Sequence, residues 1–596
     1  MATTTATPTA TATATSTGTA GPTATPTSTP GPEAGSVLVA GGDSGGKLGG
    51  IINLATDTNS SASAQVFDST TDTFVLVGNL NTKRESSVAV ALPNGLTLIA
   101  GGQSCSAKTV GGQDGFQCDA LQTSELYNES TQTFTVAGSG SRGLMTIARS
   151  GPSATLISGS GTALDGQVLI VGGSTGSSFL SITPPSPGPG VPTGQVALNS
   201  AELYNPATDA FTATSSIPEC AAGTSCATGL PAVCAGAQSA IASASESGTT
   251  VTIAMTTANP AGLIIGDKVT VSNVSVAGYN GNFIVTAIPN GSTFEYTAAS
   301  GLAAGSGGAA AADTAQCGMV DQGAALIPND GGKVLLAGGD LVTFLGESSN
   351  LSFIFDPATQ IFSRSTGSLA TPRELFPLVA MDPSVVTGTL SGHMVAYGGI
   401  EANSSACSTP GQMVATTLNT AEVFDPSSQT WSPAANTMGV KRAAAATLLE
   451  TGSLAGEVII PGGVDAEVGT LPSTCYGVTG ITQAAQSETD LYDPATGTFT
   501  ATGSLNQARE GAGQGVIGAG SDMTDVLVIG GACTTPSPSL QSVTLGTSQA
   551  ATTCRSTSAQ NDYSELYSQS TQLWTVGPAP ATGFTPTNAP AAAVLP

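Results

Sequence analysis

The sequence predicts an all-β fold built from seven copies of one four-stranded unit. An apolar run that ends in Gly-Gly occurs seven times, and a variable loop joins each run to a second signature, such as Ala-Glu-Leu-Tyr-Asn-Pro-Ala-Thr-Asp-Ala-Phe. Almost no segment of residues 36–596 has the apolar spacing of an amphipathic helix. This self-similarity indicates a repeat architecture, in which each unit packs against its neighbours. The glycine pairs end at Gly42, Gly102, Gly173, Gly339, Gly399, Gly463 and Gly531.

Each unit reads as four short strands, here called a to d in chain order. Strand a is an apolar run of small residues, such as residues 88–93, and strand b is the run that ends in the glycine pair. Strand c carries the Glu-Leu-Tyr type of pattern, and strand d begins at a recurrent Phe or Trp. Asn/Asp-Pro-Ala-Thr segments join c to d, which predicts tight turns because Asp or Asn caps its own turn and Pro presets φ. Alternating β-branched and aromatic residues support the strands.

Two aromatic columns and a row of arginines complete the pattern. Strand c carries an aromatic residue in every unit (Phe67, Tyr127, Tyr204, Phe355, Phe424, Tyr492, Tyr567), and so does strand d (Phe74, Phe134, Phe211, Phe362, Trp431, Phe499, Trp574). An arginine leads into strand a at Arg84, Arg149, Arg373, Arg442 and Arg509. Together these residues resemble the kelch repeat over most of residues 36–596. The resemblance implies a seven-bladed β-propeller, in which large rings fill the wedges between blades and few strand edges are exposed.

The chain supplies the strands of the first blade out of order. The first repeat begins directly at strand b, residues 36–42, with no strand a before it. The C-terminal segment Ala-Ala-Ala-Val-Leu-Pro, residues 591–596, resembles residues 88–93 of the second repeat. We expect this segment to complete the first blade and close the ring. The alternative is a strand donated between neighbouring molecules.

Composition shifts divide the chain into four parts. Residues 1–35 form a Thr/Ala/Pro-rich tail, 36–217 hold blades 1–3, 218–317 hold a cysteine-flanked insertion, and 318–596 hold blades 4–7 with the closing strand. The tail is expected to be a disordered or extended stalk, with O-glycosylation in one interpretation. In another, its alternating Thr-Ala stretch lies along the sheet edge of a second subunit and makes a polymer.

The insertion, from about residue 235 to 312, reads as a small β module. Its strands are separated by Gly-Asp and Asn-Gly turns. The stretch Val-Ser-Val-Ala-Gly-Tyr-Asn-Gly-Asn at 274–282 resembles small β-sandwich-like modules of bacterial and phage surface proteins. That resemblance gives a module type and no activity.

Charge and hydropathy exclude several partners. The 596 residues include 14 basic and 40 acidic side chains, for a net charge of −26. This balance argues against nucleic acid and anionic membranes as ligands. No apolar stretch approaches the roughly 20 residues of a membrane-spanning helix.

The ten cysteines are expected to form disulfides. They lie outside the predicted strands, no Cys-x-x-Cys occurs, and the chain has a single His, so zinc spacing is absent. Disulfides would place the protein in an oxidising environment, extracellular or at the cell surface. The alternative is free buried cysteines. The predicted pairs are Cys105–Cys118, Cys533–Cys554, Cys407–Cys475, Cys220–Cys226 and Cys234–Cys317.

We expect the binding site on the face where the b–c and d–a loops emerge, because the b–c loops are long and variable loops on a rigid scaffold carry function. The insertion exits on this loop face, and the five motif arginines are expected near it, around the central channel. One interpretation is that these arginines bridge blades or pair with carboxylates, since Glu85, Glu374 and Glu510 directly follow three of them. The other is that they bind carboxylates of an acidic ligand, as kelch adaptor proteins do.

The sequence argues against an enzyme. Galactose oxidase shares the kelch propeller, but its copper site needs two histidines and a modified Tyr–Cys pair, and this chain has only His393. We therefore predict no catalytic residue, metal or cofactor. The expected function is non-enzymatic binding of a protein or glycan, or adhesion, through the loop face. One alternative is a structural subunit of an extracellular filament, self-assembled through the tail or the insertion, and a second is a glycan-active enzyme.

Overall fold

The computed structural model describes most of the chain beyond the N-terminal tail, within the compact unit 32–596. The N-terminal tail lies outside the described residues, and so do the expectations placed on it. The described residues are 35–42, 60–110, 113–138, 143–181, 196–217, 239–257, 259, 268–298, 300–312, 319–340, 348–403, 414–468, 481–518, 525–533, 541–543, 552–553, 556–557, 560–561, 563–584 and 590–595.

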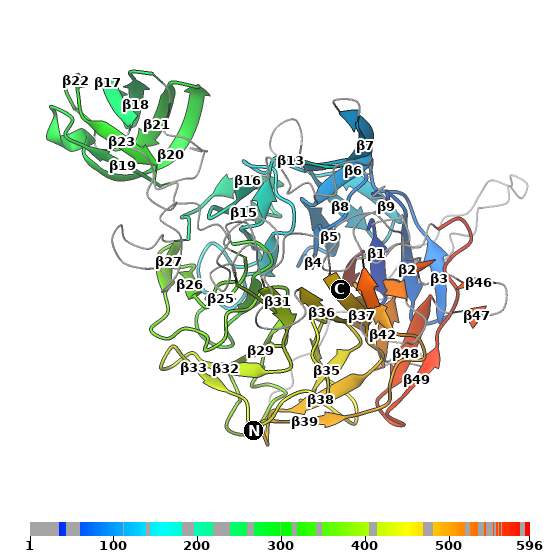
Figure 1. Ribbon diagram of the computed structural model, residues 1–596. Helices are drawn as coiled ribbons and strands as arrows, with labels where there is room; N and C mark the ends of the chain where they lie inside the picture. Colours follow the sequence, from blue (N-terminus) through cyan, green and yellow to red (C-terminus); the bar gives the residue numbers. More distant parts are fainter. Residues whose placement is uncertain are drawn as a thin grey trace, which may run out of the picture. The chain divides into compact units, whose positions relative to one another are not determined.

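Seven antiparallel four-stranded sheets form the blades of a β-propeller, as predicted (Figure 1). In every blade, strand b is flanked by a and c, and d lies outermost. Blade 1 holds β50 (Ala591–Val594), β1 (Val37–Ala40), β2 (Ala64–Asp68) and β3 (Thr73–Leu76). Blade 2 holds β4 (Val88–Ala91), β5 (Leu96–Ala100), β8 (Ser124–Asn128) and β9 (Thr133–Val136); blade 3 holds β10 (Ser153–Leu156), β11 (Val168–Val171), β15 (Ala201–Asn205) and β16 (Ala210–Ala213).

The remaining four blades follow the same order. Blade 4 holds β24 (Gly323–Leu326), β25 (Val334–Ala337), β26 (Ser352–Asp356) and β27 (Ile361–Arg364); blade 5 holds β28 (Leu378–Ala380), β29 (Met394–Tyr397), β32 (Ala421–Asp425) and β33 (Thr430–Pro433). Blade 6 holds β34 (Thr447–Leu448), β35 (Val458–Pro461), β38 (Thr489–Asp493) and β39 (Thr498–Ala501); blade 7 holds β41 (Gly513–Val516), β42 (Val526–Ile529), β48 (Ser564–Ser568) and β49 (Leu573–Val576).

The C-terminal strand closes the ring, which confirms the prediction. Strand β50 pairs antiparallel with β1 along its whole length, from Val37↔Val594 to Ala40↔Ala591. The pairing extends past the strand ends, since the Gly35 amide donates to the Leu595 carbonyl at 2.9 Å and the Leu595 amide donates to Ser36 at 2.8 Å. β50 also contacts β4 and β41, the innermost strands of the blades on either side. The first and last segments of the propeller are thus held in one sheet.

Both aromatic columns lie where adjacent blades meet. In every blade the ring of strand c contacts the ring of strand d, with centroids 4.8 to 5.4 Å apart. The pair Tyr127 and Phe134 of blade 2 packs in one buried cluster with Leu38 and Val66 of blade 1. Each ring pair therefore fills the wedge toward the preceding blade, where two diverging sheets would otherwise leave a void.

The glycine pairs mark close backbone contacts between blades. The second glycine of blade 1, Gly42, donates its amide to the carbonyl of Arg84 at 2.8 Å, at the entrance to blade 2. The equivalent Gly102 has φ +88°, and a Cβ atom there would lie 2.4 Å from the Glu85 carbonyl oxygen. Only glycine fits that approach.

The insertion forms its own barrel-like sheet between β16 and β24 in the chain. Its strands are β17 (Ser239–Ser247), β18 (Thr250–Met255), β19 (Lys268–Ser272), β20 (Gly281–Asn290), β21 (Thr293–Thr297), β22 (Gly305–Ser306) and β23 (Ala309–Ala312). They pair in the order β18-β21-β20-β19-β23-β17, and β17 pairs again with β18, so the sheet closes on itself. The recognisable stretch of residues 274–282 holds a loop, with η2 (Ala277–Tyr279), in which the Asn280 side chain accepts from the Val274 amide and donates to its carbonyl.

Among the described residues, no helix is long and apolar enough to cross a membrane.

Removing the closing strand tests the ring. A chain truncated after Pro590 loses β50, the partner of β1, together with the core side chains Ala591 and Leu595. We expect it to lose its single cooperative thermal transition and to be cleaved by protease in blade 1, because the truncation exposes the edge of β1. Circular dichroism melting and limited proteolysis check this. Unchanged melting would show that closure contributes nothing.

Candidate binding face

The b–c loops of neighbouring blades pair with each other into additional sheets. The loop of blade 2 is a hairpin of β6 (Gln103–Val110) and β7 (Gln113–Ala120), and β7 pairs with β13 (Ser177–Ser181) from the loop of blade 3. The loop of blade 3 adds the pair β12 (Ser174–Thr175) and β14 (Val196–Ala197). We call the sheet β6–β7–β13 the first loop sheet.

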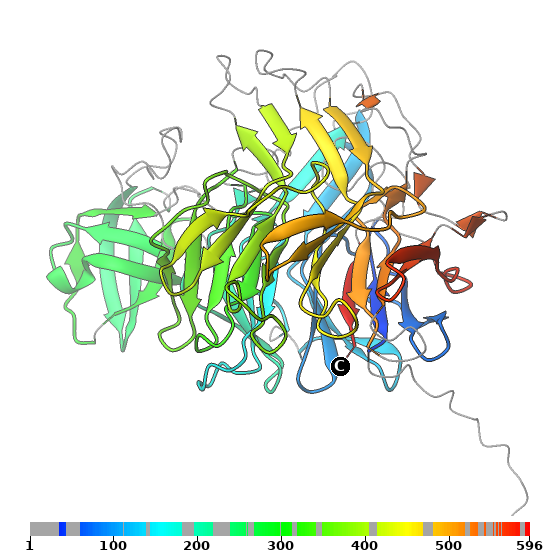
Figure 2. The same cartoon turned by 90° about the horizontal axis from the view of Figure 1, so that it is seen from below.

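A second loop sheet joins blades 5, 6 and 7. It contains β30 (Ile400–Asn403), β31 (Val414–Thr417), β36 (Val464–Val468), β37 (Ile481–Ala485) and β44 (Gln541–Val543), in that order. Figure 2 shows its hairpins, yellow-green and yellow, rising from one side of the blades. Blade 7 adds β40 (Arg509–Glu510), β43 (Ala532–Cys533), β45 (Thr552–Thr553) and the small hairpin of β46 (Ser556–Thr557) and β47 (Gln560–Asn561). The loop face is therefore a set of strands, where the sequence predicted long loops. The Gly-Gly at residues 111–112 between two runs of equal length was the available hairpin signal.

The five motif arginines are buried inside the blades. Each is at most 1% exposed and forms an ion pair with a carboxylate of strand c in the blade that it enters. Arg84–Glu125, Arg149–Glu202, Arg373–Glu422 and Arg509–Glu565 have N–O distances of 2.7 to 2.9 Å, and Arg442 pairs with Asp490. Burial lowers the pKa of Arg84, and the charge of Glu125 opposes that shift.

Each ion pair also ties down the linker between two blades. In blade 2, the Glu125 carboxylate accepts the backbone amides of Asn81 and Thr82, at 2.6 and 2.9 Å. The Arg84 guanidinium donates to the carbonyls of Gly101 and Thr123, at 2.7 and 3.1 Å. One Arg–carboxylate pair thus satisfies buried polar groups of the linker, the glycine pair and strand c at once. We call this arrangement the blade clasp.

Two blades replace the clasp in a correlated way. In blade 4 the arginine position is Met319 and the carboxylate position is Phe353, and both are buried in one apolar cluster. In blade 1 the carboxylate position is Gln65, whose side-chain oxygen accepts the Ala581 amide at 2.9 Å and whose amide donates to the Tyr563 hydroxyl at 2.9 Å. At the described clasp positions, a carboxylate on strand c therefore occurs only where the arginine also occurs.

These contacts match the structural interpretation of the arginines. Each of the five guanidinium groups lies against a carboxylate of its own blade, and a ligand would reach it only after that ion pair opened. The carboxylates that pair with them belong to strand c, and are distinct from Glu85, Glu374 and Glu510, which directly follow three of the arginines.

Acidic side chains gather where the chain enters blades 4 and 5. Asp340 follows the glycine pair of blade 4 and exchanges backbone hydrogen bonds with Val320 at 2.8 and 3.1 Å. The next residue, Asp321, accepts the Leu375 amide on its backbone carbonyl at 3.0 Å, directly beside Glu374. Glu401 lies on β30 of the second loop sheet. We call Asp321, Asp340, Glu374 and Glu401 the rim carboxylates.

Three of the rim carboxylates, Asp321, Glu374 and Glu401, have a raised pKa. Burial and the charge of Asp340 raise the pKa of Asp321 to about 7, because protein surrounds its carboxyl group even though part of the residue is exposed. Burial, Asp340 and Asp321 raise the pKa of Glu374 well above its usual value. Burial also raises the pKa of Glu401, while Arg373 opposes that shift. A positive charge brought to this rim would relieve the repulsion.

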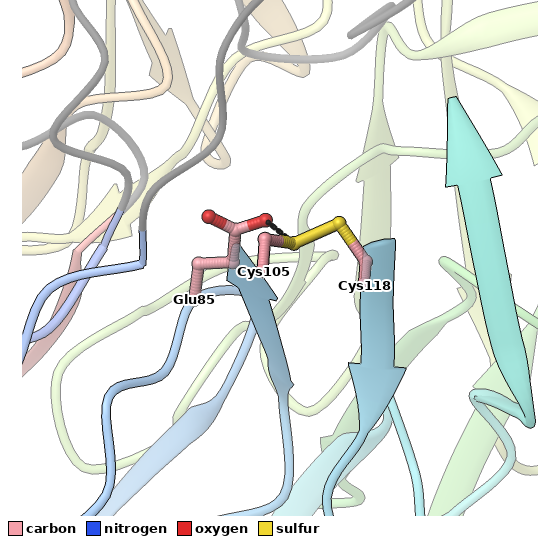
Figure 3. Close-up of side chains that lie close together, drawn as sticks. All are labelled: Glu85, Cys105 and Cys118. Carbon is pink, nitrogen blue, oxygen red and sulfur yellow. Dashed lines mark hydrogen bonds between the residues drawn. A yellow bond between two sulfur atoms is a disulfide. The ribbon is translucent and has the colours of Figure 1, made fainter. Parts of the chain in front are cut away.

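The first loop sheet contains the predicted Cys105–Cys118 disulfide (Figure 3). The two cysteines face each other across β6 and β7, with Cα atoms 4.0 Å apart. The Oε1 atom of Glu85 lies 3.0 Å from the Cys105 sulfur. This confirms one of the five predicted pairs. For the other four, Cys533 has only its backbone described, in β43, and Cys554, Cys407, Cys475, Cys220, Cys226, Cys234 and Cys317 lie outside the described residues.

His393 and the aspartates of three c–d turns make contacts that explain them without a catalytic or metal-binding role. The Nε2 atom of His393 lies 3.9 Å from Oδ1 of Asp425, at the start of β29. Asp356, Asp425 and Asp493 each accept the backbone amide two residues later at 2.8 Å, which confirms them as turn caps. Among the described residues, one set of three potential metal ligands lies close together: Glu85, Cys105 and Cys118. The two sulfurs of this set are bonded to each other in a disulfide.

No protein-family model and no curated protein matches the chain. Among solved structures, the chain is similar to one described as "Structure of YjhT", at 12% identity, with 83% of this chain and 97% of that chain covered and a TM-score of 0.38. A likeness this distant carries no argument about function.

The blade clasp predicts strong coupling between its two charges. Replacing Arg84 by Met leaves the buried Glu125 unpaired and should lower the free energy of unfolding by about 3–5 kcal/mol. The double variant Arg84→Met/Glu125→Phe copies blade 4 and should recover more than half of that loss. Chemical denaturation of both single variants and the double variant checks this. Additive losses would show that the two charges are not coupled.

The rim predicts a pH effect. Asp321 has a folded-state pKa of about 7 against 3.8 for the unfolded group, so the folded protein binds more protons between these values. Its contribution to the free energy of unfolding is therefore present below about pH 4 and is lost as pH rises through 7. Asp321→Asn should flatten this decline by on the order of 1–3 kcal/mol, and Asn suits the positive φ of 56° at this position. Denaturation of both proteins at pH 4.5 and pH 8 checks this, and an equal difference at both pH values would contradict it.

Proposed function

We propose that the chain is a non-enzymatic, extracellular propeller of the kelch type that binds a protein through its loop face. The observation that carries this proposal is the pairing of b–c loops from different blades into two loop sheets. Most connections between strands are short, and long ones without secondary structure are uncommon. The b–c loops of this protein are long and form additional strands. The loop sheets would give a partner a preorganised surface, which lowers the entropic cost of binding.

The net charge of the whole chain, −26, favours a cationic partner segment and would steer its encounter. Two of the rim carboxylates, Asp321 and Glu374, form no ion pair with a lysine or arginine in the described part of the chain. Their raised pKa favours the protonated form, and lysine or arginine side chains of a partner would lower that pKa and favour the ionised form. A glycan is less favoured, because stacking on sugars needs exposed aromatic rings and the described loop strands carry few.

The extracellular location is supported by the Cys105–Cys118 disulfide, since such bonds persist mainly in oxidising environments.

A binding measurement with a charge-matched control tests the proposal. The probes are a lysine decapeptide, a glutamate decapeptide and a neutral glycan panel, each presented to immobilised full-length protein. The rim variant Asp321→Asn/Glu374→Gln/Glu401→Gln removes three carboxylates from the loop face. The control variant Asp356→Asn/Asp425→Asn/Asp493→Asn removes three from the c–d turns on the other face, and each Asn can still cap its turn.

We expect the lysine peptide to bind the wild-type protein and the control variant alike, and to bind the rim variant at least about tenfold more weakly at low salt. Equal losses in both variants would indicate attraction by net charge alone and contradict a site on the loop face. Binding of a neutral glycan, unaffected by the rim variant, would replace the cationic partner with a glycan.

A further inference from the structure

We propose that the Cys105–Cys118 disulfide is a thiol-exchange site in which Glu85 accepts the hydrogen bond of the reduced Cys105 thiol, so that the folded protein is converted between a disulfide and a dithiol state. The chemical class of its reaction partner is a low-molecular-weight thiol. The inference concerns a different part of the loop face from the rim carboxylates and stands independently of the proposed function.

The argument begins with the contact between carboxyl and sulfur. The Glu85 Oε1 atom lies 3.0 Å from the Cys105 sulfur (Figure 3). The same oxygen accepts a hydrogen bond from the Gln103 side-chain amide at 2.9 Å. All three groups belong to adjacent backbone segments, because Glu85 and Gln103 exchange backbone hydrogen bonds at 2.9 and 3.0 Å. The carboxyl group is therefore held in place by contacts that do not involve the disulfide.

A disulfide sulfur carries no proton, so it cannot donate to that oxygen. A thiol at the same position can donate, without movement of either group. The contact thus gains a hydrogen bond only in the dithiol state, and with an ionised Glu85 this bond would be stronger than one between neutral groups. Glu85 is 4% exposed, so little water competes for its oxygen.

The two cysteines differ in how accessible they are to an external thiol. Cys105 is 2% exposed and Cys118 is 9% exposed, so Cys118 is the more accessible residue. An external thiolate would attack the Cys118 sulfur, form a mixed disulfide there, and release the Cys105 sulfur beside Glu85. That sulfur takes up one proton and becomes a thiol. A second external thiol then releases Cys118 as a thiol, so two electrons and two protons enter the protein and the external thiols leave as a disulfide.

The position of the bond gives the exchange a structural consequence. The Cys105 amide donates to the Ser60 hydroxyl of blade 1 at 2.8 Å, and the Cys118 backbone faces Ser178 of β13 from blade 3. The disulfide therefore clamps the hairpin that links the loops of three blades. Reduction would loosen the first loop sheet and leave the blades beneath unchanged.

A redox titration of the full-length protein tests this inference. Folded protein is equilibrated in reduced and oxidised glutathione buffers, thiols are trapped by alkylation, and the state of the peptides that hold Cys105 and Cys118 is read by mass spectrometry. The variants are Glu85→Gln, and Asp165→Asn as a control that removes one exposed carboxylate from a turn of blade 3. Circular dichroism confirms that each sample remains folded.

We expect the wild-type protein and Asp165→Asn to be reduced without unfolding. In Glu85→Gln the equilibrium should favour the disulfide by about fivefold to tenfold, because a charge-assisted hydrogen bond to the thiol is replaced by a weaker neutral one. In Cys105→Ser the remaining thiol should form a mixed disulfide with glutathione faster than in Cys118→Ser. Reduction of the bond only after unfolding, or an equilibrium that is the same in Glu85→Gln, would overturn the inference.

Discussion

The structure depends on a buried ion pair that recurs in five of the seven blades. An arginine at the entrance of a blade and a carboxylate on its strand c lie in the most crowded part of the repeat, where a linker, a glycine pair and strand c bring many backbone polar groups together. Burying two charges is costly, and it becomes favourable only because the charges satisfy each other and those backbone groups. Blade 4 shows the alternative solution, in which Met319 and Phe353 replace both charges at once.

The sequence predicted the repeats, the aromatic wedges and the closure of the ring because each follows from local pattern. The equivalence of residues 591–596 and 88–93 was enough to place β50 beside β1. The carboxylate partners of the arginines were harder to predict from the sequence. Strand c has the pattern Glu-Leu-Tyr in several blades, and in an alternating strand this pattern predicts an exposed acidic residue. The correlated loss of Arg and Glu in the fourth repeat was visible in the sequence and would have identified the pair.

The candidate site was predictable as a face and not as a set of residues. The length of the b–c loops indicated the face, but strand pairing between loops of different blades depends on contacts far apart in the chain, such as β7 with β13. The cluster of rim carboxylates could not be predicted from the sequence for the same reason. Asp321, Asp340 and Glu374 belong to three separate segments that only the closed ring brings together. Of these groups, Glu374 directly follows Arg373, whose ion pair with Glu422 fixes the segment that carries it.

The central claim is that the clasps fasten five of the blades to the linkers that enter them. Native-state hydrogen exchange of the linker amides tests this claim most directly. The amides of Asn81 and Thr82, bound by Glu125, and those of Asn506 and Gln507, bound by Glu565, lie outside any strand. The account predicts that they exchange as slowly as amides of the buried strand β5. Exchange as fast as that of the c–d turn amides, such as Ser130, would contradict it.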